Sequence, residues 1–418
     1  MSAHASPSYV PTEAATVPKA SLWRKLPIPL AAIGLGALAL AFVLGSDETG
    51  KNPQFWFSYL TSFAFWLSIG LGGFVFVLIH HATRAGWSTV VRRIAENFMI
   101  TLPLMGVLGL ALAFGGANTL YEWTTPELVH NQALLAKKTW WLEEGFFQIR
   151  AVIYLALWIL VPMALYRWST KQDITGDEDL SHKMRRWAPL GAIAFALTLT
   201  FSIIDFTMSL DWHWYSTIYG VYYFGAAMMM IGIALSLTSM TIQRSGLLKD
   251  HITTEHYHDL GKWTFAFMVF WSYIAFSQFM LIWYANIPEE TLWFAYRVEG
   301  GWEVVTLLLA LLHFVVPFFF LMSRHIKRRK ATLIAGSVLL IIAHYIDMFW
   351  LVQPKLSMRY FGGGHHAFFS ISIVDLLAFI GIGGLFLAVV TWRMAAKPVA
   401  PVKDPRLAES LSFENQNY

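Results

Sequence analysis

The sequence predicts an all-α membrane protein with about ten transmembrane helices. Of its 418 residues, 56% are hydrophobic and only 13% are charged, a balance that ordinary soluble domains do not have. Apolar windows of roughly 17–26 residues, each long enough to cross a bilayer as a helix, recur about ten times. The windows are Leu26–Leu44, Phe55–Ile79, Phe98–Phe114, Phe146–Tyr166, Trp187–Leu210, Tyr215–Met240, Trp263–Tyr284, Val304–Met322, Ala331–Leu351 and Phe368–Trp392.

The distribution of positive charge predicts that both ends of the chain are cytoplasmic. With that orientation, all but seven of the 30 lysines and arginines fall in cytoplasmic segments, which is the bias that orients helices in membranes. We therefore expect a transmembrane domain over residues 26–394, with cytoplasmic tails at 1–25 and 395–418. The seven residues on the outer side or at outer span edges are Lys51, Lys137, Lys138, Arg150, Arg297, Lys355 and Arg359.

The absence of cysteine limits the redox chemistry that this chain can hold. Disulfides, thiolate metal sites, cysteine-ligated iron–sulfur clusters and covalently attached haem are all excluded. Redox centres are therefore expected on partner chains or bound noncovalently, and the sequence contains no recognised motif for a metal or a nucleotide. We interpret the basic run at 324–330 as a topology anchor rather than a nucleic-acid site.

Matching landmarks in the two halves of the chain indicate an internal duplication. Spans two to five would form one four-helix bundle over about 53–210, and spans six to nine a second over about 211–353, with spans one and ten at the flanks. Because each unit has an even number of helices, the units share one orientation and are related by an axis along the membrane normal. The matched pairs, first copy then second, are Phe55–Ser58 and His213–Ser216, Tyr121–Glu127 and Trp283–Glu289, Glu144-Gly145 and Glu299-Gly300, Val161-Pro162 and Val316-Pro317, and Asp205 and Asp347.

Each copy places an aspartate inside a hydrophobic span, with a polar residue one turn away. Ser202 lies three residues before Asp205, and His344 lies three residues before Asp347. Residues with this spacing are neighbours on a helix. A hydroxyl or imidazole group beside a carboxyl group is suited to relay protons, and histidine changes charge near neutral pH. The alternative is that each aspartate only joins neighbouring helices through hydrogen bonds.

Further ionisable residues extend these hypothetical proton pathways toward both membrane surfaces. Glu144 and Glu299 are expected at the N-termini of spans four and eight, where they either release protons or stabilise the helix dipole. Glu303 lies one turn after Glu299, and His313, near the middle of span eight, either bridges the pathway or bonds to a neighbouring helix. Residues that either take up protons or have only a local role are His80, His81, Glu96 and Asn97 near the inner surface, and Asp375 in span ten.

Two sequence runs resemble the ActF-type membrane subunits of alternative complex III, a bacterial quinol:electron-acceptor oxidoreductase. The runs are Asp-Phe-Thr-Met-Ser-Leu-Asp-Trp-His-Trp-Tyr-Ser at 205–216 and Trp-Tyr-Ala-Asn-Ile-Pro-Glu-Glu at 283–290. The ten-span, two-bundle layout is also similar, so the resemblance covers nearly all of the chain and extends to NrfD- and PsrC-type subunits. It implies a subunit of the bacterial inner membrane that conducts protons, holds no haem or cluster and is not an enzyme alone.

The same resemblance implies partners and ligands for this chain. The expected partners are a multihaem cytochrome c, an iron–sulfur protein and an NrfD-like paralogue with the better-established quinol site, together with membrane lipids. A quinone or menaquinone is the ligand that the family implies for this subunit, although the sequence assigns no residue to bind it. Two other classes stay open: an independent secondary transporter, which parallel repeats with intramembrane carboxylates also fit, and a diheme b-type cytochrome with His313 and His344 as ligands.

Overall fold

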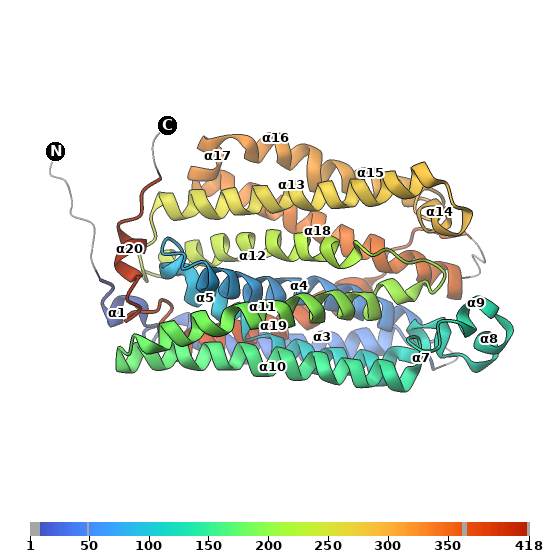
Figure 1. Ribbon diagram of the computed structural model, residues 1–418, viewed down its shortest axis with the longest axis horizontal. Coiled ribbons are helices and arrows are strands. Elements are labelled where there is room, and N and C mark those ends of the chain that lie inside the picture. Colours follow the sequence, from blue (N-terminus) through green and yellow to red (C-terminus); the bar gives the residue numbers. More distant parts are fainter. Residues whose placement is uncertain (1–8, 48–49, 362–365, 416–418) are drawn as a thin grey trace.

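A computed structural model describes residues 9–47, 50–361 and 366–415, and in these ranges the chain is all helix and loop with no strand (Figure 1). Ten of the described helical segments are long and apolar enough to cross a membrane. The predicted fold class, an all-α protein with ten membrane spans, is therefore confirmed. The protein is a multi-pass membrane protein.

Each predicted apolar window coincides with one span, although most spans extend past their windows into polar residues. The third, fifth and eighth spans are each built from more than one helical segment. In order, the spans are α3 (Pro27–Leu44), α4 (Pro53–Ala82), the third span made of α5 (Thr89–Met99), α6 (Leu102–Ala111), η1 (Leu112–Gly116) and α7 (Ala117–Leu120), then α10 (Glu144–Thr175), α11 (Asp179–Phe206) with η3 (Met208–Leu210), α12 (Tyr219–Arg244), α13 (Thr254–Ala285), the eighth span made of α15 (Trp302–Ala310), η4 (Leu311–Val315) and α16 (Val316–Met322), and finally α18 (Lys330–Tyr360) and α19 (Ile373–Ala396).

Helix α4 lies at the centre of the molecule. Its most apolar window is 89% buried, and the helix is hydrophobic on all sides, as expected of a span surrounded by other helices. It contacts α5, α6 and α11 of the first predicted repeat and α12 and α18 of the second. Within the second group, α12, α13, α15, η4, α16 and α18 pack on one another, while α3 packs against α19 and α19 packs against α4. The relation of the two groups as parallel repeats stays a prediction.

The short helices are divided between the two ends of the bundle (Figure 1). Helices α1 (Thr12–Ala15), α17 (Arg324–Arg328) and α20 (Leu407–Leu411) lie at one end, which we call the terminal end. Helices α8 (Pro126–Asn131), α9 (Ala133–Ala136) and α14 (Pro288–Ala295) lie at the other, which we call the far end.

The segment after α19 packs across the terminal end instead of leaving it as a loose tail. The amide of Val399 donates to the carbonyl of Ala15 at 2.8 Å, and the side chains of Leu407 and Leu411 are buried. Burial of these apolar side chains explains why residues 395–415 follow the surface of the bundle. The sequence placed a tail here, and the structure adds that the described part of the tail belongs to the folded core.

Two π-helical segments interrupt the regular hydrogen bonding of the spans. One is η1 in the third span, and the other is η4 in the eighth span, which ends two residues before Pro317. Proline lacks the amide hydrogen that a regular helix uses at that point, so a local change in helix geometry beside Pro317 is expected. Segments of this kind are frequent at functional sites. In this protein, η4 carries His313.

Candidate functional site

The carboxylate of Asp205 in α11 is held by an arginine from the neighbouring span. Arg150 of α10 donates from Nε to Oδ2 at 2.8 Å and from Nη2 to Oδ1 at 2.9 Å. The hydroxyl of Tyr154 donates to Oδ2 at 2.6 Å, and the indole nitrogen of Trp141 donates to Oδ1 at 3.0 Å. Because Asp205 is fully buried and accepts four hydrogen bonds, its charge is compensated within the protein.

Arg150 is itself fixed by the residues around it. Its Nη1 donates to the carbonyl of Trp141 at 3.1 Å, and its guanidinium lies 4.1 Å from the Trp141 ring centroid and 4.5 Å from that of Phe146. The sequence predicted Ser202 as the partner of Asp205, but the Ser202 hydroxyl donates to the carbonyl of Leu199 at 3.1 Å. The geometry of the Asp205 site therefore fits the helix-joining alternative better than a relay.

The carboxyl group of Asp347 in α18 has a different environment. It is also fully buried, but in the described part of the chain only one of its oxygens is hydrogen-bonded. Oδ1 accepts a short hydrogen bond from the hydroxyl of Tyr222 in α12. The other oxygen, Oδ2, lies 3.9 Å from Nδ1 of His344, and this ring nitrogen also lacks a hydrogen bond among the described residues.

The second nitrogen of His344 is bonded across the two halves of the protein. Nε2 lies 3.0 Å from Oγ of Ser68 in α4, and Ser68 Oγ donates to the carbonyl of Phe65 at 2.6 Å. A hydroxyl group has one hydrogen, so Ser68 uses it on Phe65 and accepts from Nε2 of His344. In the neutral imidazole, Nδ1 then carries the lone pair that faces Asp347. One proton can thus reside on either Asp347 Oδ2 or His344 Nδ1.

His313 of η4 completes this group of polar side chains. It is fully buried, and neither of its ring nitrogens has a hydrogen bond to a residue that the structure describes. Its ring centroid lies 6.2 Å from that of His344 and 3.6 Å from that of Trp271, which also lies beside Asp347. We call Tyr222, Trp271, His313, His344 and Asp347 the Asp347 cluster. Buried polar atoms without partners are costly, so this concentration of them calls for an explanation.

Tyrosine and threonine hydroxyl groups continue from the Asp347 cluster toward the far end. Tyr219 lies one turn from Tyr222 in α12, and its hydroxyl donates to Oγ1 of Thr207 at 3.0 Å. Thr207 lines a small cavity that also includes Asp211 and Lys355. These tyrosines could not be singled out from the sequence, because a tyrosine that bonds to a polar group on a neighbouring helix has the same sequence signal as an interfacial or packing tyrosine.

The residue that caps the helix of span four is not the one that the sequence predicted. Glu144 is the first residue of α10, as expected, but Glu143 is the residue that caps the helix. The carboxylate of Glu143 accepts from the amides of Gly145 at 3.0 Å and Phe146 at 2.6 Å. Glu144 accepts from Gln148 at 3.3 Å and is half-buried. Its predicted role in proton release is unchanged by this geometry, but the capping alternative applies to its neighbour.

Glu299 does not begin the eighth span. Helix α15 starts at Trp302, after Gly300 and Gly301, which both have positive φ angles of 61° and 96°. Such angles favour glycine, and a Cβ on Gly300 would lie 2.1 Å from the carbonyl oxygen of Ala367. The position predicted for Glu299 is therefore wrong by three residues. Its carboxylate lies 3.3 Å from Nδ1 of His366.

Glu303, not Glu299, is the acidic residue in the first turn of α15. Its carboxylate accepts from the amide of Gly301 at 2.8 Å and is exposed. The predicted continuation of a pathway from Glu299 through Glu303 has no hydrogen bond between the two side chains in the described structure. The Glu-Gly pairs that look alike in sequence thus precede two different helix starts.

Glu96 lies in a buried ion-pair network near the terminal end. Its carboxylate accepts from Arg93 at 2.7 Å and from Ser169 of α10 at 2.9 Å, and Arg93 also contacts Asp173 at 2.6 Å. Glu96 is therefore not simply solvated, because the network ties α5 to α10. Asn97 is also buried and accepts from Tyr166 at 3.4 Å.

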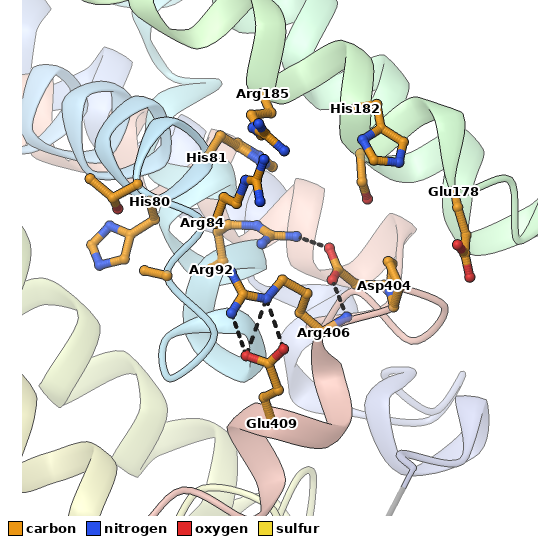
Figure 2. Close-up of a pocket in the computed structure, with 14 residues that line it drawn as sticks. His80, His81, Arg84, Arg92, Glu178, His182, Arg185, Asp404, Arg406 and Glu409 are labelled. Carbon is orange, nitrogen blue, oxygen red and sulfur yellow. Dashed lines mark hydrogen bonds and ion pairs between the residues drawn. The ribbon is translucent and has the colours of Figure 1, made fainter.

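The two adjacent histidines at the end of α4 have different surroundings. His80 stacks on Phe76 with 3.9 Å between ring centroids, and its Nδ1 lies 2.7 Å from the Phe76 carbonyl. His81 and His80 both line an open pocket of about 660 Å³ at the terminal end (Figure 2). The side chains of His80, His81 and Glu96 make no hydrogen bond to one another in the described structure, so a joint role in proton uptake stays a prediction.

Asp375 of span ten has a structural environment. Its Oδ2 accepts from the amide of Ser372 as part of the cap of α19, and its Oδ1 accepts from Ser58 at 2.5 Å and from Gln353 at 3.1 Å. These bonds join α19 to α4 and α18. The local alternative is thus the better description of Asp375.

Arg297, in the connection before span eight, is a buried cation that pairs with carbonyl groups. It donates to the carbonyls of Trp293 at 2.7 Å, Trp350 at 3.1 Å and Leu351 at 3.0 Å, and it stacks on the Trp293 ring at 3.5 Å. Burial lowers the pKa of Arg297 to about 9, so the guanidinium keeps its charge at neutral pH. Arg297 thus joins this connection to the far end of α18 through backbone carbonyls and makes no ion pair with the carboxylate of Asp347 in the described structure.

Comparisons with known proteins add no identification. No family model matches this chain, and no match was found among curated proteins. Within the described residues, no group of three or more histidine, aspartate or glutamate side chains is placed to hold a metal ion.

Proposed function

We propose that this protein conducts protons as a membrane subunit of a quinol-oxidising electron-transfer complex. The observation that carries the proposal is the Asp347 cluster, in which a buried carboxyl group and two buried imidazoles have nitrogen or oxygen atoms without hydrogen bonds among the described residues. Ionisable groups inside a membrane protein are functional by default, because they are expensive to retain there.

The proposed step is transfer of one proton between Asp347 and His344. Their facing atoms are 3.9 Å apart, so a shift of about 1 Å brings them within hydrogen-bond distance. Ser68 keeps the imidazole oriented by accepting from Nε2. His313, 6.2 Å from His344 between ring centroids, is the next group that can take the proton.

Toward the far end, the proton leaves through hydroxyl groups and not through Glu299. Tyr222 bonds to Asp347, and Tyr219 bonds to Thr207 beside the cavity that contains Asp211. Tyr222 and Tyr219 have no hydrogen bond to each other in the described structure, and the Thr207 hydroxyl donates to the carbonyl of Ile203 at 2.8 Å. Passage along this route therefore requires the hydroxyl groups to rotate or water to bridge them. In this scheme, the ion pair of Asp205 and Arg150 holds the first group of helices together and carries no proton.

The partners and the cellular location follow from the resemblance and from composition. We place the protein in the bacterial cytoplasmic membrane with both termini in the cytoplasm, which puts the far end on the outer side. A multihaem cytochrome c, an iron–sulfur protein and an NrfD-like paralogue would hold the redox centres, in agreement with a chain that has no cysteine. Quinone or menaquinone would be oxidised or reduced in the assembly, and this chain alone would not be an enzyme.

The proposal is tested by purifying the tagged protein from its native membranes in mild detergent. We expect haem-containing and iron–sulfur proteins to be retained with it, and quinol oxidation by the assembly in sealed vesicles to release protons. Asp347→Asn should lower the number of protons per electron while leaving assembly unchanged, and Ser202→Ala should change neither. A solitary, monodisperse protein would remove the complex-subunit proposal and leave the secondary transporter.

A haem-binding role for His313 and His344 fits the geometry less well. His344 Nε2 is bonded to Ser68, and the ring of His313 lies directly against Trp271. Both rings would have to leave these positions to ligate haem iron. A Soret band in the isolated subunit that disappears in His344→Gln would favour the cytochrome instead.

A further inference from the structure

The open pocket at the terminal end is built from four separate parts of the chain (Figure 2). Its lining comes from the end of α4 and the turn that follows it, from α5, from the start of α11, and from residues 404–409. We call it the terminal pocket. Since residues 404–409 close one side of it, the pocket exists only when the C-terminal segment is packed on the bundle.

Two of the four arginines in the terminal pocket are committed to carboxylates. Arg92 forms a short ion pair with Asp404, and Arg406 pairs with Glu409 at 2.5 Å. Burial acts to raise the pKa of the Asp404 carboxyl group, but the charge of Arg92 and its hydrogen bond outweigh burial and lower the pKa. Asp404 is therefore an anion, and its negative charge compensates the positive charge of Arg92.

The other two arginines, Arg84 and Arg185, have no ion pair with any residue in the described ranges. Glu178 is the remaining acidic residue in the lining, and it makes no ion pair with either of them. Figure 2 shows Arg84, Arg185 and His81 grouped on the side of the pocket above the Arg92–Asp404 pair. The pocket thus presents two uncompensated guanidinium groups.

His81 supplies an additional donor in the same place. Its side chain is only 6% exposed, and its Nε2 has no hydrogen bond to any part of the chain that the structure describes. A buried imidazole nitrogen beside two guanidinium groups is suited to a multiply charged oxyanion, because the guanidinium groups donate to its oxygens and the neutral imidazole also donates when its hydrogen is on Nε2. The chemistry of this donor set is that of a phosphate site.

The surface next to the terminal pocket is suited to the rest of a phospholipid. Beyond Arg185 along α11, the apolar side chains of Leu190, Ile193 and Leu197 lie on one helix face with exposed fractions of 57%, 60% and 53%. Trp187 is half-exposed and lies between Arg185 and Leu190 in the sequence, as interfacial tryptophans do. Acyl chains could therefore follow α11 while the headgroup occupies the pocket.

We propose that the terminal pocket binds a phosphate-bearing anion through His81, Arg84 and Arg185, either the headgroup of an anionic phospholipid or free phosphate. This site is separate from the Asp347 cluster and does not depend on the proposed proton conduction. Binding would stabilise the packing of the C-terminal segment on the bundle, because Asp404, Arg406 and Glu409 line the same pocket.

The test compares lipid retention by the complete purified protein in native mass spectrometry, with phosphatidylglycerol or phosphatidylcholine as the probe. The variant Arg84→Gln/Arg185→Gln removes two charges from the pocket, and Arg167→Gln/Lys171→Gln removes two exposed charges from α10 as a matched control. We expect the first variant to weaken phosphatidylglycerol binding by about tenfold or more, and the control to leave it unchanged. The single variant His81→Gln should also weaken phosphatidylglycerol binding, without disturbing the Arg92–Asp404 or Arg406–Glu409 ion pair.

Titration with inorganic phosphate separates the two sources of the anion. If millimolar phosphate competes with phosphatidylglycerol, and this competition is lost in Arg84→Gln/Arg185→Gln, the pocket is a headgroup site. Phosphate binding that needs both arginines, with no preference for phosphatidylglycerol over phosphatidylcholine, supports a soluble phosphate ligand. Equal effects of the pocket variant and the control variant on both probes would overturn the proposal.

Discussion

The two intramembrane aspartates occupy corresponding places in the sequence but opposite environments in the structure. Asp205 accepts four hydrogen bonds, two of them from Arg150. Within the described ranges, Asp347 accepts one hydrogen bond, from Tyr222, and its second oxygen faces His344 at 3.9 Å. A carboxylate that is fully paired has a fixed charge and a fixed position, whereas one with a free oxygen beside an imidazole can exchange a proton. Two acidic residues at positions that the predicted duplication makes equivalent therefore have different environments.

The difference arises from the residues that surround each aspartate. If the landmark Glu144 is matched to Glu299, then the position of Arg150 corresponds to Val305, and no cation replaces it. In the register that matches Glu144 to Glu299, an indole in the middle of the span corresponds to an imidazole. In the register that matches Asp205 to Asp347, a hydroxyl group corresponds to an imidazole. The pairs are Trp158 and His313, and Ser202 and His344. In these registers, the second predicted copy has two imidazole rings and no arginine at the position of Arg150.

Replacement of Arg150 is expected to have the largest effect on the difference between the two aspartate sites. Arg150→Leu should lower the free energy of unfolding by about 3–5 kcal/mol, because it leaves the Asp205 carboxylate buried without its cation. Unfolding in detergent, followed by tryptophan fluorescence, measures the change. Asp347→Asn should cost only about 1 kcal/mol, since the wild-type group makes one hydrogen bond.

A double variant shows whether the cost of Arg150→Leu comes from the unpaired charge. In Arg150→Leu/Asp205→Leu both charged groups are replaced, and much of the lost stability should return. Equal destabilisation by Arg150→Leu and Asp347→Asn would mean that the two sites are not different in the proposed way.

Replacement of the His344 imidazole tests whether the Asp347 site transfers protons. His344→Gln keeps a polar side chain that can bond to Ser68 but cannot take a proton at the position of Nδ1. We expect the rate of proton transfer through the assembly to fall about a hundredfold, as for loss of a group that carries protons. Proton release measured with a pH-sensitive dye in vesicles checks this, and an unchanged rate would assign the cluster a structural role.

Asp211 provides a third environment, at the water-facing far end. Burial acts to raise the pKa of Asp211, but hydrogen bonds from His213 and the charges of Lys355 and His213 outweigh it and lower the pKa to about 2. A lowered folded-state pKa stabilises the protein above the ordinary range of aspartate, and this contribution is lost as the pH falls from about 4 to about 2. The loss should be about 2 kcal/mol in the wild type and absent in Asp211→Asn, as measured by unfolding at each pH.

Ser202→Ala is expected to have the smallest effect. Among the residues that the structure describes, the Ser202 hydroxyl donates only to a carbonyl of its own helix, so its removal should change the free energy of unfolding by less than about 0.5 kcal/mol and leave proton transfer intact. A clear loss of proton transfer in Ser202→Ala would restore the relay that the sequence predicted for the first copy.

The spans could be predicted from sequence because the length and polarity of a segment decide whether it crosses a bilayer. The partners of the polar groups could not be predicted in this way. Arg150 and Asp205 belong to different helices, and His344 meets Ser68 across the contact between α18 and α4. Helical spacing identifies neighbours on one helix only, which explains why it selected Ser202 for Asp205. The start of α15, three residues after Glu299, depends on a turn of two glycines with positive φ angles, one of which lies against the backbone of Ala367, far away in the sequence.

Infrared difference spectroscopy of the purified protein, as the pH is changed, tests the central claim most directly. It detects the C=O band of a buried protonated carboxyl group, and the claim is that Asp347 exchanges a proton whereas Asp205 does not. We predict a pH-dependent carboxyl band that is present in the wild type and in Ser202→Ala and is lost in Asp347→Asn. A band that persists in Asp347→Asn and is lost in Asp205→Asn would contradict the assignment of the two sites.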